Sequence, residues 1–286
     1  LDLIKTADYL VDLGPEGGNA GGQGFSMDSS SNGADLVYTD DTLESYSDIF
    51  DNAETDVTEE DERRVIASLM GLSTGEGLSA FLDIDQVIAY FAAHNFVLNY
   101  DSYTGTMLHN YYLSESDGRL GMIPWDYNLS FGAFGGQGQA SSQNDASQYV
   151  SWGIDAPLSG TTADARPMWA WIANGATYLD RYHQVFDELM GSYFESGAYA
   201  TEIQRVSEMI SPFTAQDPSA FYTFEEYEVG VETLESFCGL RAESVRAQLA
   251  GSLAADSSLQ DTADQVDASS ITISDMGSQS MDTRGN

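Results

Sequence analysis

The sequence predicts an α+β fold in which helices precede and follow one β-hairpin. Two segments before residue 100 carry apolar residues at helical spacing, residues 107–113 and 119–125 resemble two paired strands, and the pattern is helical again from about residue 167. The chain has 286 residues, and 42% of them are hydrophobic. That length and composition allow one large domain or two small ones with a substantial core.

Two helices are expected before the hairpin. Thr58 is a suitable N-cap, because an acidic first turn and then an apolar stripe over residues 65–70 follow it. Asp83 is a suitable N-cap for a second helix, whose apolar residues recur at helical spacing and end near Asn99. Asp101 therefore comes directly after a helix.

The hairpin is predicted from a turn between two strand-like runs. Asp117 and Gly118 separate these runs, and Asp-Gly favours a tight two-residue turn. From about residue 167 to 253 the sequence predicts a helical subdomain, with Cys238 as a packed helical thiol.

Two further segments lack regular patterns. Residues 14–33 are rich in Gly, Ser and Asn and match neither GxGxxG nor GxxxxGK[ST], so we interpret them as a linker rather than a phosphate-binding loop. Residues 254–286 contain no aromatic residue and little periodicity, which predicts a disordered acidic tail.

The charge excludes some functions. There are 46 Asp and Glu residues and 10 Lys and Arg residues, which give a formal charge of -36. This charge disfavours binding to nucleic acids and to anionic membrane surfaces. It fits a basic protein partner, a high-salt environment or a well-solvated exported protein, and it does not choose between them.

Several kinds of site are not expected. One Cys permits no internal disulfide, and the three His residues lack the spacing of a zinc site, so each of them is interpreted as structural or exposed. No run of about 18 apolar residues occurs, so no membrane span is predicted, and no signal peptide is seen.

Three polar residues form a candidate catalytic group. Asp101 follows a helix, Asn110 opens the hairpin, and Asp126 lies where the second strand ends. Protein kinases use the same order of catalytic Asp, metal-binding Asn and metal-binding Asp. The spacing differs, because Asn110 is nine residues after Asp101 and Tyr127 follows Asp126. Taken singly, the three residues could instead be a turn residue, an exposed strand residue and a cap.

Longer segments resemble a known family. HNYYL, IPWDYNLSFG, ARPMWAWI, YHQVFDELMGSYFESG, DPSAFYTFEEYEVGVETL and LRAESVRAQL are similar to segments of the CotH kinase family, the spore coat protein H family, over residues 33–253. The resemblance implies an atypical protein kinase-like fold with a short or truncated N-terminal lobe and a helical C-terminal lobe. It also implies phosphorylation of protein Ser or Thr residues that depends on ATP and on Mg²⁺ or Mn²⁺.

The resemblance assigns roles to individual residues. Asp101 corresponds to the catalytic Asp, and Asn110 and Asp126 correspond to the metal ligands. Trp125 is expected to form a wall of the ATP site. Lys5, the sole lysine of the chain, is expected to contact ATP unless an arginine takes that role.

One position departs from the family's pattern. Asn128 stands where many relatives carry a second Asp, so it is interpreted equally as a metal ligand or as a structural amide.

The expected domains are a remnant of the N-terminal lobe or a linker (1–32), a kinase-like domain (33–253) and the tail (254–286). The expected partner is a basic, Ser-rich protein substrate, and the expected location is secreted, on the cell surface or in the spore coat. The alternative is a non-catalytic spore-coat or surface binding protein of the same family. A carboxylate-pair glycosidase is disfavoured, because the sequence offers no aromatic-lined sugar cleft.

Overall fold

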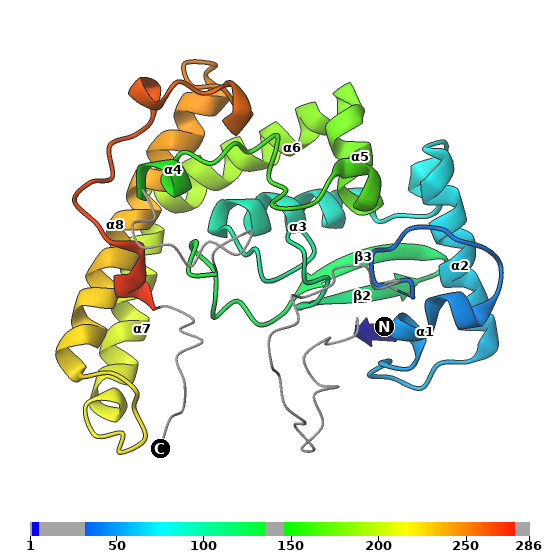
Figure 1. The fold of residues 1–286 in the computed structure, drawn as a ribbon, viewed down its shortest axis with the longest axis horizontal. Coiled ribbons are helices and arrows are strands. Elements are labelled where there is room, and N and C mark those ends of the chain that lie inside the picture. Colours follow the sequence, from blue (N-terminus) through cyan, green and yellow to red (C-terminus); the bar gives the residue numbers. More distant parts are fainter. Residues whose placement is uncertain (1, 6–31, 135–145, 278–286) are drawn as a thin grey trace, which may run out of the picture.

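The structure, a computed structural model, describes residues 2–5, 32–134 and 146–277. Helices and a small antiparallel sheet make up these parts, so the predicted mixed α+β class is confirmed (Figure 1). The strands are β1 (Asp2–Lys5), β2 (Tyr111–Ser116) and β3 (Arg119–Pro124). The helices are α1 (Ser47–Phe50), α2 (Glu59–Thr74), α3 (Ile84–Val97), α4 (Ala146–Val150), α5 (Pro167–Asn174), α6 (Ala176–Leu189), α7 (Ala198–Thr214) and α8 (Phe224–Leu249).

The predicted hairpin is confirmed as β2 and β3. Its register pairs Tyr111 with Pro124 at one end and Ser116 with Arg119 at the other. Asp117 and Gly118 form the turn with φ of 52° and 79°, as a tight turn of the primed type requires. The first strand begins at Tyr111 rather than at residue 107. The sequence did not indicate β1, which extends the sheet beside β2 and pairs Lys5 with Tyr112.

The two predicted helices before the hairpin are confirmed. Thr58 and Asp61 form a reciprocal capping box at the start of α2, and the side chain of Asp83 accepts a hydrogen bond from Gln86 N at the start of α3. α3 ends at Val97 because Leu98 takes a left-handed conformation, with φ of 52°. α3 therefore stops four residues before Asp101.

The second half is helical, as predicted, and it covers α3. Figure 1 shows α3 between the hairpin and α6, and α3 contacts β3 on one side and α5 and α6 on the other. The core between these elements is aromatic: Phe91 of α3 lies 5.4 Å from the ring of Trp169 and 6.2 Å from that of Tyr103. Cys238 is buried in α8, as expected, and burial raises the pKa of its thiol to about 12.

The predicted disordered tail is wrong for residues 254–277. This segment forms three short 3-10 turns, and Ala268 and Ile273 are buried in a cluster with Phe237 of α8. The chain crosses α8 so closely that a Cβ on Gly230 would lie 2.8 Å from the carbonyl oxygen of Asp275. A lack of periodicity excludes a long helix but does not exclude packing of single apolar side chains. Residues 278–286 lie outside the described residues.

The predicted linker at residues 14–33 also lies outside the described residues, apart from residues 32 and 33, as does most of the predicted N-terminal segment 1–32. Among the helices that the structure describes, none is long and apolar enough to cross a membrane.

Candidate functional site

Asp101 lies in a buried loop between α3 and β2, and both of its carboxylate oxygens have partners. His109 Nε2 is 2.6 Å from Asp101 Oδ1, and Asn110 Nδ2 donates to Asp101 Oδ2 at 3.1 Å and to the Asp101 carbonyl oxygen at 2.8 Å. Asp101 and His109 are only 6% and 4% exposed. These contacts hold the Asp101 carboxylate in one orientation.

The hairpin brings Asp126 to the same end of the sheet. Asn110 directly precedes Tyr111, and Asp126 comes two residues after Pro124, the partner of Tyr111 in the register. Two antiparallel strands place the start of one beside the end of the other. The structure therefore joins Asp101 and Asn110 by hydrogen bonds and places Asp126, which is exposed, at the hairpin end that carries them.

Unusual backbone conformations gather around this end of the hairpin. Asn110 and Asp126 have φ of 56° and 50°, and Leu98, Leu108 and Phe131 also lie in the left-handed region. Asn and Asp tolerate this region, whereas for Leu and Phe it is rare and costs free energy. Such conformations cluster at functional sites, where the surrounding structure enforces them. Their concentration here supports a functional role for the loops on both sides of the hairpin.

A surface pocket of about 470 Å³ lies beside Asp126. Tyr90, Ala93 and Val97 of α3 form one side, and residues 124–127 form the other. Trp125 is 48% exposed, and its ring is supported by Tyr112 at a centroid distance of 5.0 Å. The pocket therefore has an aromatic wall and one carboxylate at its edge. Asn128 is exposed and is not part of the lining.

A buried histidine connects this pocket to the Asp101 loop. His94 Nδ1 lies 2.6 Å from the hydroxyl of Tyr127, and His94 Nε2 lies 2.7 Å from that of Thr104. Burial lowers the pKa of His94 to about 3. The imidazole is therefore neutral at physiological pH and acts as a fixed polar bridge.

Two buried arginines hold the backbone around the site. Arg166 donates to the carbonyl oxygens of Tyr103 and Gly105, both at 2.7 Å, in the loop that follows Asp101. Arg241 has no exposed surface and donates to carbonyls at the end of α3 and of residues 150 and 152. Burial lowers the pKa of both guanidinium groups, to about 10 for Arg241. The arginines satisfy carbonyls that a loop would otherwise leave unpaired.

The site offers few charged groups for a ligand. Within the described ranges, no three His, Cys, Asp or Glu side chains are close enough together to hold a metal ion. No described arginine lines the pocket. The backbone of Lys5 lies beside Tyr112 in the sheet, but its side chain is not among the described parts. A metal at Asn110 and Asp126 would thus need ligands from a bound molecule.

Sequence reasoning missed His109, Arg166 and Arg241 as parts of this site. His109 had a usable signal, because it directly precedes Asn110 in the HNYYL segment. Arg166 and Arg241 lie in the quoted segments ARPMWAWI and LRAESVRAQL, but their partners are backbone carbonyls distant in the sequence.

Comparison with protein families identifies the chain's relatives. The family model described as CotH kinase protein matches residues 9–245. The chain belongs to the CotH kinase family. The match starts earlier than the expected residue 33 and ends slightly before the expected residue 253.

Comparison with individual proteins gives a distant relative. Inner spore coat protein H of Bacillus subtilis (strain 168) is 23% identical over 171 residues, which cover 59% of this chain and 42% of that protein. A stretch of 23 residues, 8% of the chain, is 78% identical to UvrABC system protein A of Pasteurella multocida and 83% identical to that of Pseudomonas putida. The short stretch covers 2% of each of those proteins, so the chain spans less than half the length of every relative named here.

Proposed function

We propose that this CotH family member is an atypical protein kinase that phosphorylates Ser or Thr residues with ATP and Mg²⁺ or Mn²⁺. The observation that carries the proposal is the contact between Asp101 and Asn110 at the hairpin end that also presents Asp126. Protein kinases place a catalytic Asp, a metal-binding Asn and a metal-binding Asp in this order. We therefore propose a kinase-like fold for residues 33–253, with residues 254–277 packed on α8.

Asp101 is the proposed catalytic base. Phosphoryl transfer needs mainly positioning and neutralisation of charge, and a carboxylate near the acceptor orients its hydroxyl and accepts its proton. His109 and Asn110 fix the Asp101 carboxylate from two sides, so it is oriented before a substrate arrives.

Asn110 and Asp126 fit the metal of such a reaction. The amide nitrogen of Asn110 is used in bonds to Asp101, which leaves its oxygen for a cation, and Asp126 offers an exposed carboxylate. Mg²⁺ prefers oxygen ligands and keeps several waters, so two protein ligands and phosphate oxygens suffice. When bound, the metal neutralises charge on the phosphates.

The pocket beside Trp125 is the proposed site for the nucleotide base. Its aromatic wall suits stacking against a flat ring, and Asp126 at its edge lies on the side of the proposed metal. Lys5 is the proposed cation for the phosphates, because its strand pairs with Tyr112, whose ring supports Trp125.

The proposed substrate is a basic, Ser-rich protein, since the formal charge of -36 attracts cationic segments. The relative named as an inner spore coat protein supports a proposed association with the spore coat. A secreted or cell-surface location fits the same acidic surface.

Two aspartate variants test the function because a base and a metal ligand fail differently. Asp126→Asn should weaken the affinity for ATP in the presence of Mg²⁺, because it removes the charge that holds the metal. Asp101→Asn should leave this affinity nearly unchanged and lower phosphate incorporation roughly a hundredfold, about 2.7 kcal/mol of barrier. Calorimetry with and without EDTA measures the first effect, and transfer of labelled phosphate measures the second.

Asp117→Asn is the matched control, because Asp117 lies in the turn at the other end of the same hairpin, is exposed, and has a conformation that Asn adopts well. This variant should change neither the affinity for ATP nor phosphate incorporation, and circular dichroism checks that each variant is folded.

If the unchanged chain transfers no phosphate, it is instead a non-catalytic binding protein of the family. Loss of ATP affinity in Asp101→Asn alone would reverse the two assignments.

A further inference from the structure

The outer end of the α7–α8 hairpin, residues 208–229, extends beyond the rest of the fold. We call this segment the α7–α8 tip. Figure 1 shows α7 and α8 side by side, with the loop that joins them far from β2 and β3. No residue of α7 is buried, and the first buried residue of α8 is Thr233. The tip therefore contributes little to the core.

The tip is unusually apolar for an exposed segment. Ten large hydrophobic residues are well exposed among the described residues, and six of them lie in the tip. Phe221 is fully exposed and Phe213 is 75% exposed. The other four are Met209, Ile210, Tyr222 and Val229. Exposed apolar residues that gather in one place typically mark an interaction site.

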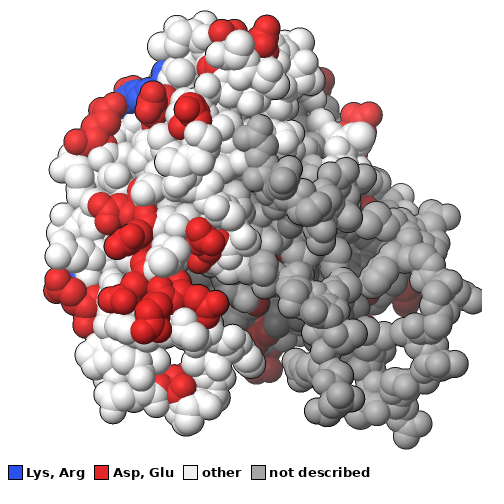
Figure 2. All heavy atoms as spheres, turned by 60° about the vertical axis from the view of Figure 1, so that its left-hand side comes forward, with Lys and Arg blue, Asp and Glu red and all other residues white. Residues whose placement is uncertain are grey.

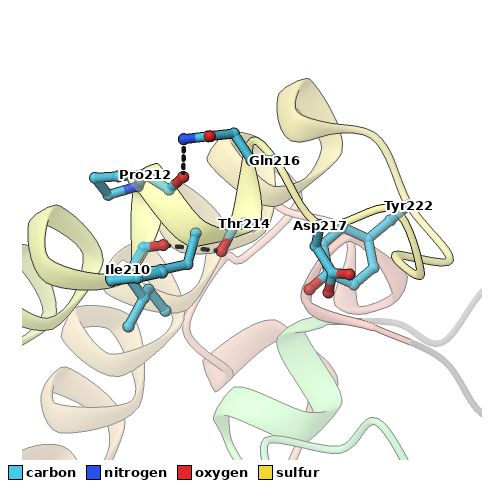
Figure 3. Close-up of a pocket in the computed structure, with 7 residues that line it drawn as sticks. Ile210, Pro212, Thr214, Gln216, Asp217 and Tyr222 are labelled. Atoms are coloured by element: carbon cyan, nitrogen blue, oxygen red, sulfur yellow. Dashed lines mark hydrogen bonds between the residues drawn. The ribbon is translucent and has the colours of Figure 1, made fainter.

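Three of these side chains, Ile210, Phe213 and Tyr222, border a pocket of about 640 Å³ (Figure 3). Ile210, Phe213 and Thr214 of α7 line one part, and Asp217 and Tyr222 of the connecting loop line another. Local hydrogen bonds hold its shape: Gln216 Nε2 donates to the Pro212 carbonyl oxygen at 2.8 Å, and Asp217 Oδ1 accepts from Ser219 N at 2.8 Å. These bonds fix the backbone on two sides of the pocket.

The surroundings of the pocket are strongly acidic. Residues 198–235 contain eight Asp and Glu residues and one basic residue, Arg205, which is already paired with Glu202 at 2.6 Å. Asp217 lies in the pocket wall, and its hydrogen bonds with Ser219 lower its pKa, so it is charged at neutral pH. Figure 2 shows the side of the molecule that α7 and α8 occupy, where acidic residues recur and basic ones are scarce.

We propose that the α7–α8 tip binds a cationic amphipathic helix of a partner protein. Its apolar face would occupy the pocket and cover Phe213 and Phe221, and its Lys and Arg side chains would lie over the surrounding carboxylates. Helices commonly bind grooves in this way, and opposite charges select the partner. A second copy of the chain or an anionic lipid surface would bring like charges together. This site is separate from Asp101 and does not rest on the proposed kinase activity.

The apolar part is tested with the whole chain and a fluorescent helical peptide that has leucines on one face and lysines on the other. The Kd is measured by fluorescence anisotropy. The double variant Phe213→Ser, Phe221→Ser should raise the Kd about tenfold or more, because buried aromatic side chains supply much of the binding energy. Leu259→Ser is the matched control, since Leu259 is also 75% exposed but lies outside the tip. It should leave the Kd within about twofold.

The charged part is tested with two triple variants that change the net charge equally. Glu208→Gln, Glu225→Gln, Glu228→Gln alters the tip, and Glu54→Gln, Glu60→Gln, Glu76→Gln alters exposed residues outside the tip. The first should raise the Kd about tenfold near 0.15 M salt, and the second should raise it about twofold at most. A scrambled peptide of the same composition should bind more weakly than the amphipathic one.

Several results would overturn the proposal. Equal losses in the two triple variants would mean that only net charge matters. Equal affinity for a peptide with Glu in place of Lys would remove the role of the carboxylates. A dimer in sedimentation that the Phe213 and Phe221 changes abolish would make a second copy the occupant.

Discussion

Replacing Arg166 with Met should destabilise the protein through the loop that carries Asp101. Arg166 is 4% exposed and donates hydrogen bonds of 2.7 Å to the carbonyl oxygens of Tyr103 and Gly105. Met keeps much of the apolar length of the side chain but cannot donate hydrogen bonds. Two buried carbonyl groups then lose their donor, close to Asp101 in the chain.

The size of the effect follows from these contacts. A buried group without its hydrogen-bond partner costs about 1–3 kcal/mol, so two carbonyls cost roughly 2–6 kcal/mol. Burying the Arg166 charge costs free energy, as the lowered pKa of its guanidinium shows, and the Met variant no longer has this cost. We therefore expect a net loss of about 2–4 kcal/mol in the free energy of unfolding. Arg166→Lys should fall between Met and the unchanged chain, because one ammonium cannot reproduce the planar guanidinium contacts.

Urea unfolding followed by tryptophan fluorescence, to which the buried Trp169 and Trp171 contribute, measures this loss, which should lower the midpoint by roughly 1 M. Arg181→Met is the control, because Arg181 is half-exposed and pairs with Asp85 and Glu188 at the surface, where such pairs contribute about 0–1 kcal/mol. Hydrogen exchange should also become faster at Gly105, whose amide donates to the Ser102 carbonyl oxygen. Equal effects of the Arg166 and Arg181 changes would refute the reasoning.

Two further predictions concern the histidines. The pKa of His94 is about 3 in the folded protein and about 6.5 in the unfolded chain. As the pH falls, the unfolded chain therefore binds a proton before the folded protein does, and the free energy of unfolding decreases between about pH 6.5 and pH 3. His94→Gln has no such group, so the free energy of unfolding of the unchanged chain should fall by up to about 5 kcal/mol relative to that of the variant over this pH range. A difference that stays constant with pH would contradict this prediction. His109→Gln should lower phosphate transfer about tenfold but leave the affinity for Mg²⁺-bound ATP unchanged. The reason is that His109 contacts Asp101 and does not line the proposed nucleotide pocket. A loss of ATP affinity would show that His109 does more than orient Asp101.

The sequence was sufficient where the signal is local. Thr58 and Asp83 act as the predicted caps, and Asp117 and Gly118 form the predicted turn, because capping and turn formation depend on residues only a few positions apart. The juxtaposition of Asn110 and Asp126 followed from the same hairpin, since a two-residue turn fixes the register of both strands.

Other features depend on distant partners and gave no pattern. β1 pairs with β2 across more than a hundred residues of chain, and the packing of residues 254–277 uses isolated side chains such as Ile273. Hydrophobic periodicity in a sequence reveals the buried face of a helix or a strand, and neither of these two arrangements produces such a periodicity. The sequence also suggested structural or exposed roles for all histidines, while the structure places His109 directly on Asp101.

The arginines explain how segments remote from Asp101 take part in the site. Arg166 comes just before α5 and donates to the carbonyls of Tyr103 and Gly105, between α3 and β2. Arg241 comes from α8 and donates to carbonyls in the last turn of α3. A loop that turns sharply through left-handed residues cannot pair its own carbonyls as a helix or a strand does. A guanidinium group, with five donors in a fixed fork, can satisfy several of them at once. The helical second half of the chain is therefore part of the support for Asp101, which gives a physical reason why the family resemblance extends through ARPMWAWI and LRAESVRAQL rather than ending at the hairpin.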